Sequence, residues 1–93
     1  TNIRNELMKL KKNNFWIIGL ENSIDARPWY SIDYSGNTAI VFGSEGSGIR
    51  KKILETCDFI ATIPMQGTTN SLNVSAATSA IVFEKLRQKL EKK

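Results

Sequence analysis

Two stretches decide the fold of this chain: Val41-Phe-Gly-Ser-Glu-Gly-Ser-Gly-Ile49 and Ile63-Pro-Met-Gln-Gly-Thr-Thr-Asn-Ser-Leu-Asn-Val-Ser75. In each stretch an apolar run breaks into a loop rich in glycine or polar residues, and a helical pattern follows. The sequence therefore predicts strand, loop and helix, twice over. Ligands of open parallel sheets bind at the carboxyl ends of the strands, so two such loops can line one pocket.

Length and composition indicate one globular domain, residues 1–93. The chain has 93 residues, of which 41% are hydrophobic and 24% charged, so it lies far from a disordered composition. It contains no apolar run of about 18 residues that could span a membrane, and it begins with no secretory-type segment. A cytoplasmic protein is expected. Because the first residue is Thr1, a processed chain or a piece of a longer one is also expected.

The sequence offers little for metal or redox chemistry. Cys57 is the single cysteine, which excludes an internal disulfide and multi-cysteine zinc sites, and there is no histidine. No metal is therefore expected. Cys57 itself is interpreted as a small buried hydrophobe.

Basic residues are clustered although the net charge is only +4. Such clusters suit RNA phosphates, and they are also typical of solvated helix faces, so both interpretations stand. The clusters comprise Arg4, Lys9, Lys11 and Lys12, then Arg50, Lys51 and Lys52, and finally Lys85, Arg87, Lys89, Lys92 and Lys93.

The spacing of apolar residues predicts the remaining elements. Strands are predicted over 15–20, 38–42 and 59–63, and helices over 2–12, 48–55 and 72–90. Unbroken apolar runs are typical of parallel strands covered on both faces. The last helix is apolar around most of its first half, so it needs cover from the sheet and from a second surface, for which a partner subunit is a candidate.

The segment 21–37 is harder to interpret. Arg27 is expected to be extended because Pro28 follows it, and Ser35-Gly36-Asn37 predicts a turn. Trp29 and Tyr30 are predicted to anchor a short helix or turn by packing, with base stacking as the alternative.

The loop after residue 42 excludes some ligands. Its glycines at 43, 46 and 48 let a ligand approach the main chain closely. Glu45 would repel a pyrophosphate, and no Lys-Ser or Lys-Thr closes the loop, so neither a dinucleotide fingerprint nor a P-loop is present. The expected ligand is not polyanionic.

Three polar residues are candidates for the active site: Glu45, Ser71 and Asn73. Taken singly, Glu45 could be solvated or paired with Arg50, and either of the other two could cap the last helix. Taken together between two strand ends, they favour a site that orients a substrate hydroxyl beside a cofactor.

At these residues the sequence resembles the SpoU/TrmH branch of the SPOUT superfamily, the knotted RNA methyltransferases. Val41 to Ile49 is similar to the second motif of that family, and Ile63 to Ser75 is similar to the third. The resemblance is strong over about the last 55 residues and limited to layout before them. It implies a parallel sheet with helices on both faces and a trefoil knot near the C-terminus.

The resemblance also implies an activity: methyl transfer from S-adenosylmethionine to a ribose 2′-hydroxyl of rRNA or tRNA. It places the cofactor on Gly43, Ile63 and Leu72, with Met65 and Gly67 beside it, and it matches Glu45, Ser71 and Asn73 to the polar active-site positions. It further implies a homodimer packed through helices that include the last one.

One family feature has no counterpart here, namely the first motif with its asparagine and arginine, which residues 1–14 lack. The chain is therefore interpreted as the C-terminal part of a catalytic domain that keeps the cofactor pocket and lacks catalytic competence alone. The alternative is a non-catalytic RNA-binding or assembly module with the same fold. An oxidoreductase is disfavoured because the phosphate loop is missing.

Overall fold

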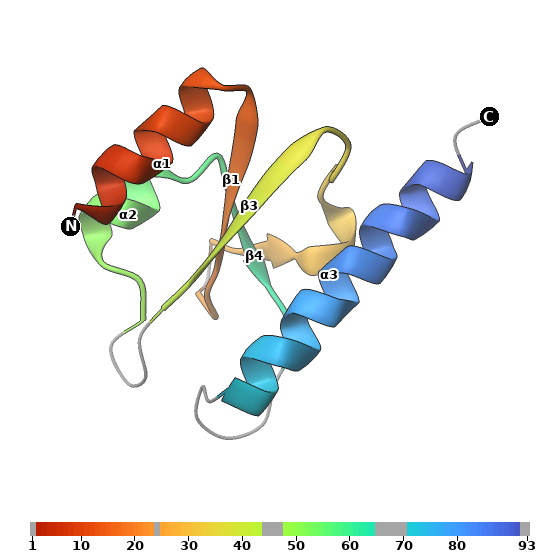
Figure 1. The fold of residues 1–93 in the computed structure, drawn as a ribbon. Coiled ribbons are helices and arrows are strands. Elements are labelled where there is room, and N and C mark those ends of the chain that lie inside the picture. The colour runs from red at the N-terminus through yellow and green to blue at the C-terminus, as the bar shows by residue number, and fades with distance from the viewer. Residues whose placement is uncertain (1, 24, 44–47, 65–70, 92–93) are drawn as a thin grey trace.

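The computed structural model describes residues 2–23, 25–43, 48–64 and 71–91. Its elements follow one another as helix α1 (Ile3–Lys12), strand β1 (Phe15–Leu20), strand β2 (Arg27–Pro28), the 3₁₀ turn η1 (Trp29–Ser31), strand β3 (Asn37–Phe42), helix α2 (Lys51–Thr56), strand β4 (Phe59–Thr62) and helix α3 (Ser71–Glu91) (Figure 1).

The strands form one parallel sheet in the order β2-β4-β1-β3. In the centre, Ile18 of β1 is in register with Ile40 of β3 and with Phe59 of β4. The predicted parallel sheet is confirmed, with each predicted strand within about a residue of its observed bounds. Strand β2 was not predicted because two residues carry no periodic signal, although Arg27 is extended as expected.

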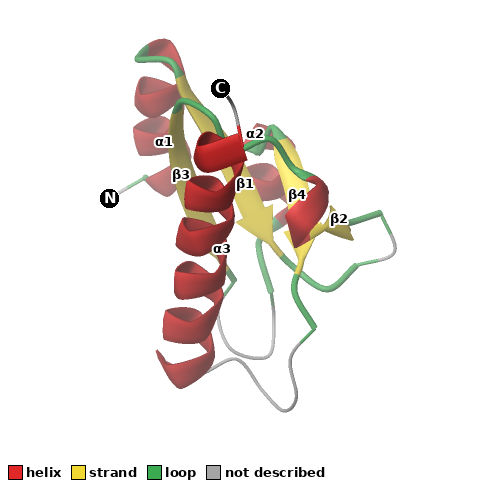
Figure 2. Cartoon of the chain, turned by 90° about the vertical axis from the view of Figure 1, so that its right-hand side faces the viewer, coloured by secondary structure: helices red, strands yellow, loops and turns green. Residues whose placement is uncertain are grey.

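Helices cover both faces of the sheet, as predicted (Figures 1 and 2). Helices α1 and α2 pack on one face, and α3 crosses the other. The core on the α3 side comprises Ile18, Ile32, Tyr34, Ala61 and Ile81. Because successive side chains of a strand alternate, the fully buried Ile17 faces the α1 and α2 layer. The path that would make a knot runs through residues 44–47 and 65–70, which lie outside the described residues, so the knot stays a prediction.

Local signals fix the ends of α1 and the turn before β3. The side chain of Asn2 accepts a hydrogen bond from the Asn5 N–H at 3.2 Å and caps α1. Asn14, with a φ of 67°, ends that helix in the left-handed region. Gly36 has a φ of 79° in the predicted turn before β3.

The predicted start of α2 is wrong. The helix was expected from about Gly48, and it begins at Lys51. Gly48 has a φ of 70°, and Arg50 is extended with a ψ of 148°, so neither residue can belong to a right-handed helix. The apolar side chain of Ile49, which suggested helical spacing, is instead buried against the sheet.

Helix α3 is held by polar side chains in its last turns. The Oε1 atom of Gln88 accepts the Tyr34 N–H at 2.9 Å, and its Nε2 donates to the Ile32 carbonyl at 2.8 Å. Nε2 also donates to the buried Glu84, which accepts two hydrogen bonds from Arg87 at 2.8 and 2.9 Å. These contacts fasten α3 to the segment that precedes β3. We call Tyr34, Glu84, Arg87 and Gln88 the α3 anchor.

The outer face of α3 is apolar and uncovered. Across the described residues, every helix is too short or too polar to span a bilayer. Nevertheless α3 exposes four large apolar residues, Val82, Phe83, Leu86 and Leu90, of which Phe83 is 69% exposed. The sheet therefore covers one side of α3, as predicted, and leaves a second apolar side free within this chain.

Candidate cofactor and active site

The carboxyl ends of β1, β3 and β4 meet at one edge of the sheet, because all three strands are parallel. Strand β3 ends at Phe42 and leads into Gly43, whereas β4 ends at Thr62 and leads into Ile63. Figures 1 and 2 show β3 and β4 ending at this edge. The two stretches thus start at the same edge of the sheet, on either side of β1, and the pocket that they were expected to line together stays a prediction.

Gly43 and Gly48, at the two ends of the first loop, lie close against each other. A Cβ atom on Gly43 would lie 2.5 Å from the carbonyl carbon of Gly48 and 2.8 Å from the backbone nitrogen of Ile49. Real Cβ atoms do not come so close to backbone, so any side chain at position 43 would force the two ends of the loop apart. Glycine at 43 is needed for this close approach, and glycine at 48 for its positive φ.

The exit of the loop is fixed by two contacts. The Ile49 N–H donates to Oε1 of Glu21 at 2.9 Å. The Ile49 side chain is 7% exposed and packs over Gly19, where a Cβ atom would lie 3.2 Å from its Cδ1 atom. Sequence reasoning missed Glu21. The position of Glu21, directly after a buried strand at the carboxyl edge of the sheet, could have indicated its role.

Three of the predicted site residues have described side-chain or backbone surroundings. Gly43 lies at the closure of the loop. Ile63 is half-buried and packs against the core cluster. Asn73 is half-buried in the first turn of α3. Gly43 and Ile63 directly follow β3 and β4 at the same sheet edge, in agreement with a shared pocket.

The other predicted site residues lie outside what the structure describes. These are Glu45, Met65 and Gly67, together with the side chains of Ser71 and Leu72, whose backbones begin α3. The predicted convergence of Glu45 with Ser71 and Asn73, and the predicted contacts of Met65, Gly67 and Leu72 with a cofactor, stay predictions.

Cys57 has a packing role. It is half-buried rather than fully buried, its Sγ donates to the Ile53 carbonyl at 3.3 Å, and it fills the space above Gly19. Burial, assisted by the charge of Asp58, raises the pKa of the thiol to about 11, so Cys57 stays protonated at neutral pH.

Within the described ranges, no group of three His, Cys, Asp or Glu side chains could hold a metal ion.

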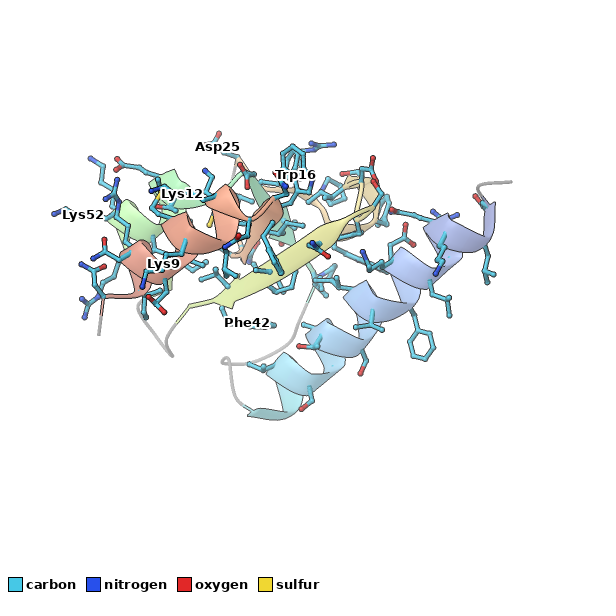
Figure 3. All side chains as sticks on the ribbon, turned by 45° about the horizontal axis from the view of Figure 1, so that its top comes forward. Lys9, Lys12, Trp16, Asp25, Phe42 and Lys52 are labelled. Atoms are coloured by element: carbon cyan, nitrogen blue, oxygen red, sulfur yellow. The ribbon has the colours of Figure 1, made fainter. Side chains whose placement is uncertain are left out.

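The basic clusters of α1 and α2 share one surface, since the two helices pack together (Figures 1 and 3). Lys9, Lys12 and Lys52 lie on the same side of the molecule in Figure 3. Some cations are already paired: Lys9 with Glu6 at 3.1 Å, and Lys11 with Asp58 at 3.4 Å. The surface therefore serves partly as a solvated helix face.

The two neighbouring aromatic residues of η1 differ in their packing. Trp29 packs against the core cluster, as predicted. Tyr30 is 61% exposed, so the expected packing is wrong for it, although its ring makes a T-shaped contact with that of Trp29 at 5.8 Å between centroids. The three-residue turn directs one ring inward and leaves the other outside.

The fold and this edge define the class of the protein: a parallel α/β domain of the SPOUT type, with its candidate site at the carboxyl edge of the sheet. A model of the SpoU rRNA Methylase family matches residues 1–83. The chain belongs to that family.

Known proteins agree with this assignment. The chain is 43% identical over 89 residues to the 23S rRNA (guanosine-2′-O-)-methyltransferase RlmB of Pseudomonas aeruginosa, a match that covers 96% of this chain and 36% of the relative. It thus spans about a third of that relative's length.

Solved structures show the same fold. The A. aeolicus TrmH/SpoU tRNA modifying enzyme superposes with a TM-score of 0.78 at 36% identity, covering 98% of this chain and 46% of that one. The SpoU methyltransferase AviRb from Streptomyces viridochromogenes superposes with a TM-score of 0.70 at 26% identity, covering 92% of this chain and 35% of that one. AviRb has also been solved in complex with the cofactor AdoMet; that structure superposes with a TM-score of 0.68 at 24% identity, covering 98% of this chain and 35% of that one.

Proposed function

We propose that this chain is the cofactor-binding part of an RNA 2′-O-ribose methyltransferase that uses S-adenosylmethionine. The observation that carries the proposal is the closure of Gly43 on Gly48 at the carboxyl edge of a sheet that belongs to the SpoU family. The relatives named above are an rRNA guanosine 2′-O-methyltransferase and a tRNA modifying enzyme, so we propose rRNA as the substrate, with tRNA as the second candidate.

The described residues suit this cofactor. Gly43 offers main chain without a side chain, and Ile63 offers an apolar, uncharged surface beside it. Leu72, Met65 and Gly67 are proposed to complete the contacts. S-adenosylmethionine, when bound, supplies a methyl group on an already activated sulfonium. Because this cofactor carries no phosphate, the acidic Glu45 does not conflict with it, as it would with a dinucleotide.

The chemistry left to the protein is positioning and proton removal. Holding the ribose hydroxyl in line with the methyl group can supply a large part of the acceleration. Glu45, Ser71 and Asn73 are proposed to orient that hydroxyl. Within these 93 residues a proton acceptor would have to be a group other than histidine, because they contain none. Since no arginine of the first motif is found in residues 1–14, we expect the 93-residue chain to bind the cofactor and to methylate RNA poorly by itself.

Titration calorimetry tests this proposal directly. The 93-residue chain is expected to bind S-adenosylmethionine saturably with a stoichiometry of one per chain. Leu72→Ala is expected to weaken binding about tenfold or more, because it removes a proposed cofactor contact. Asn73→Ala is expected to weaken it as well, because Asn73 follows Leu72 in the first turn of α3 at the same candidate site. Glu55→Ala, a change at an exposed position of α2, is the control and is expected to leave binding unchanged. Absence of saturable binding by the unmodified chain would refute the proposed cofactor.

Partners and location follow from the same proposal. The uncovered apolar face of α3 is proposed as a homodimer interface, and the basic surface of α1 and α2 as a contact for RNA phosphates. Because the relatives are bacterial proteins named for ribosomal RNA, the proposed place of action is the cytoplasm. The competing function, an RNA-binding module without catalysis, predicts RNA binding with no affinity for S-adenosylmethionine.

A further inference from the structure

Glu21 joins the ends of the two loops that flank the candidate site. Its backbone N–H donates to the Ala61 carbonyl of β4 at 3.0 Å. Its side-chain Oε1 accepts the Ile49 N–H at 2.9 Å. One residue therefore links the strand that leads into Ile63 with the exit of the glycine loop.

The carboxylate fits closely against that exit. A Cβ atom on Gly48 would lie 2.8 Å from Oε1 of Glu21, so the oxygen occupies the space that glycine leaves open. Glu21 is half-buried, and a carboxylate that accepts a backbone N–H makes a stronger hydrogen bond than a neutral acceptor does. Gly48 in turn touches Gly43 through backbone alone. Glu21 therefore contacts Gly48, and Gly48 contacts Gly43.

We propose that Glu21 is a positioning residue of the candidate cofactor site: by accepting the Ile49 N–H it holds Gly48 against Gly43 and so sets the shape of the cofactor-binding main chain. Glu21 acts through this backbone and is not itself a ligand contact. The identity of the ligand rests on the proposed function, whereas the positioning of the loop does not.

Amide hydrogen exchange tests the positioning without any ligand. In Glu21→Ala the Ile49 N–H loses its acceptor, and its exchange is expected to accelerate about tenfold or more relative to the native chain. Glu21→Gln keeps an acceptor oxygen at the same reach and is expected to retain most of the protection. Glu21→Asp keeps the charge but shortens the side chain by one carbon, so it is expected to resemble the alanine variant. Unchanged protection of Ile49 in Glu21→Ala would overturn the proposal.

Calorimetry with S-adenosylmethionine then tests the consequence for the site. Affinity is expected to fall about tenfold in Glu21→Ala and Glu21→Asp and to stay within about threefold in Glu21→Gln. Glu55→Ala is the matched control, an exposed glutamate of α2. If Glu21→Asp binds normally while Glu21→Gln does not, charge rather than the hydrogen bond matters and the proposal is wrong.

The two failures can be told apart. If the native chain does not bind the cofactor, the proposed function fails, yet the exchange of Ile49 still decides whether Glu21 positions the loop. If the native chain binds and every Glu21 variant binds equally well, the proposed function survives and the role of Glu21 is refuted. Circular dichroism of each variant verifies that it folds, and the near-isosteric Glu21→Gln provides a comparison should the alanine variant unfold.

Discussion

The glycine loop and the α3 anchor fasten the two halves of the candidate site in different ways. At the loop, backbone meets backbone between Gly43 and Gly48, and one half-buried carboxylate holds the exit. At the anchor, side chains do the work, with Gln88 and Glu84 bonded to each other and to neighbouring groups. The loop is thus held mainly by contacts between backbone atoms and by a single carboxylate, whereas the anchor depends on several side-chain hydrogen bonds.

The difference has a consequence for the site. The residues of α3 that belong to the candidate site lie in its first turn, while its polar fastening lies in the last turns. Substitutions in the glycine loop should therefore weaken cofactor binding directly, whereas substitutions in the α3 anchor should mainly lower the free energy of unfolding. Four changes test this contrast, from the largest expected effect to the smallest.

Gly43→Ala should have the largest effect. The new Cβ atom would lie 2.5 Å from backbone that cannot move away alone, so the loop must open. We expect the free energy of unfolding to fall by about 2 kcal/mol or more and cofactor binding to be lost, as measured by urea denaturation and calorimetry. Gly36→Ala is the matched control, because Gly36 has a positive φ but an added Cβ atom there would meet atoms only at 3.9 Å or beyond. The free energy of unfolding is expected to fall by about 1 kcal/mol, with cofactor binding intact. Equal losses of stability and of binding in the two variants would contradict the close contact between Gly43 and Gly48.

Gln88→Ala tests the anchor. The change leaves the Tyr34 N–H and the Ile32 carbonyl without their partner, and unpaired buried groups cost about 1–3 kcal/mol of stability. Urea denaturation measures this loss, and Lys89→Ala, at the exposed neighbouring position, is the control. Cofactor affinity should fall less than in Gly43→Ala. A larger fall in affinity than in stability would show that the anchor also shapes the site.

The free energy of unfolding at low pH tests the contribution of the Glu84 carboxylate to the α3 anchor. Hydrogen bonds from Arg87 and Gln88 lower the pKa of Glu84 to about 2 from a usual 4.5. The unfolded chain therefore binds a proton at higher pH than the folded chain, so this stabilisation is complete above about pH 5 and disappears as the pH falls towards 2. Denaturation between pH 2 and 7 should show a shallower acid loss in Glu84→Gln than in the native chain. Parallel curves would mean that Glu84 does not contribute.

Phe83→Ser should change stability least. Phe83 is 69% exposed on the outer face of α3, so its loss should alter the free energy of unfolding by less than about 0.5 kcal/mol. The proposed dimer, however, should dissociate more readily, which sedimentation velocity measures over a range of concentrations. Thr78→Ser, an exposed position outside the apolar set, serves as the control. A native chain that is monomeric throughout would refute the proposed interface.

Sequence patterns predicted the elements whose signals are local or repeated. The apolar runs 15–20, 38–42 and 59–63 became the predicted parallel strands, and Gly36 lies in the predicted turn before β3. The start of α2 was wrong because Ile49 fits helical spacing but is held by Glu21, a residue distant in sequence. Tyr30 was misjudged because side-chain burial in a three-residue turn depends on what lies around it.

The sequence by itself determined the parallel α/β class, the place of the candidate site at the carboxyl ends of two strands, and the exclusion of phosphate loops. These depend on periodicity and residue type, which a single segment carries. Only the tertiary structure decided that Gly43 closes on Gly48, that Glu21 holds the exit of the loop, and that Gln88 fastens α3. Each of these is a contact between groups far apart along the chain or brought together by a turn, and no local pattern specifies which partner a polar group finds once the chain has folded.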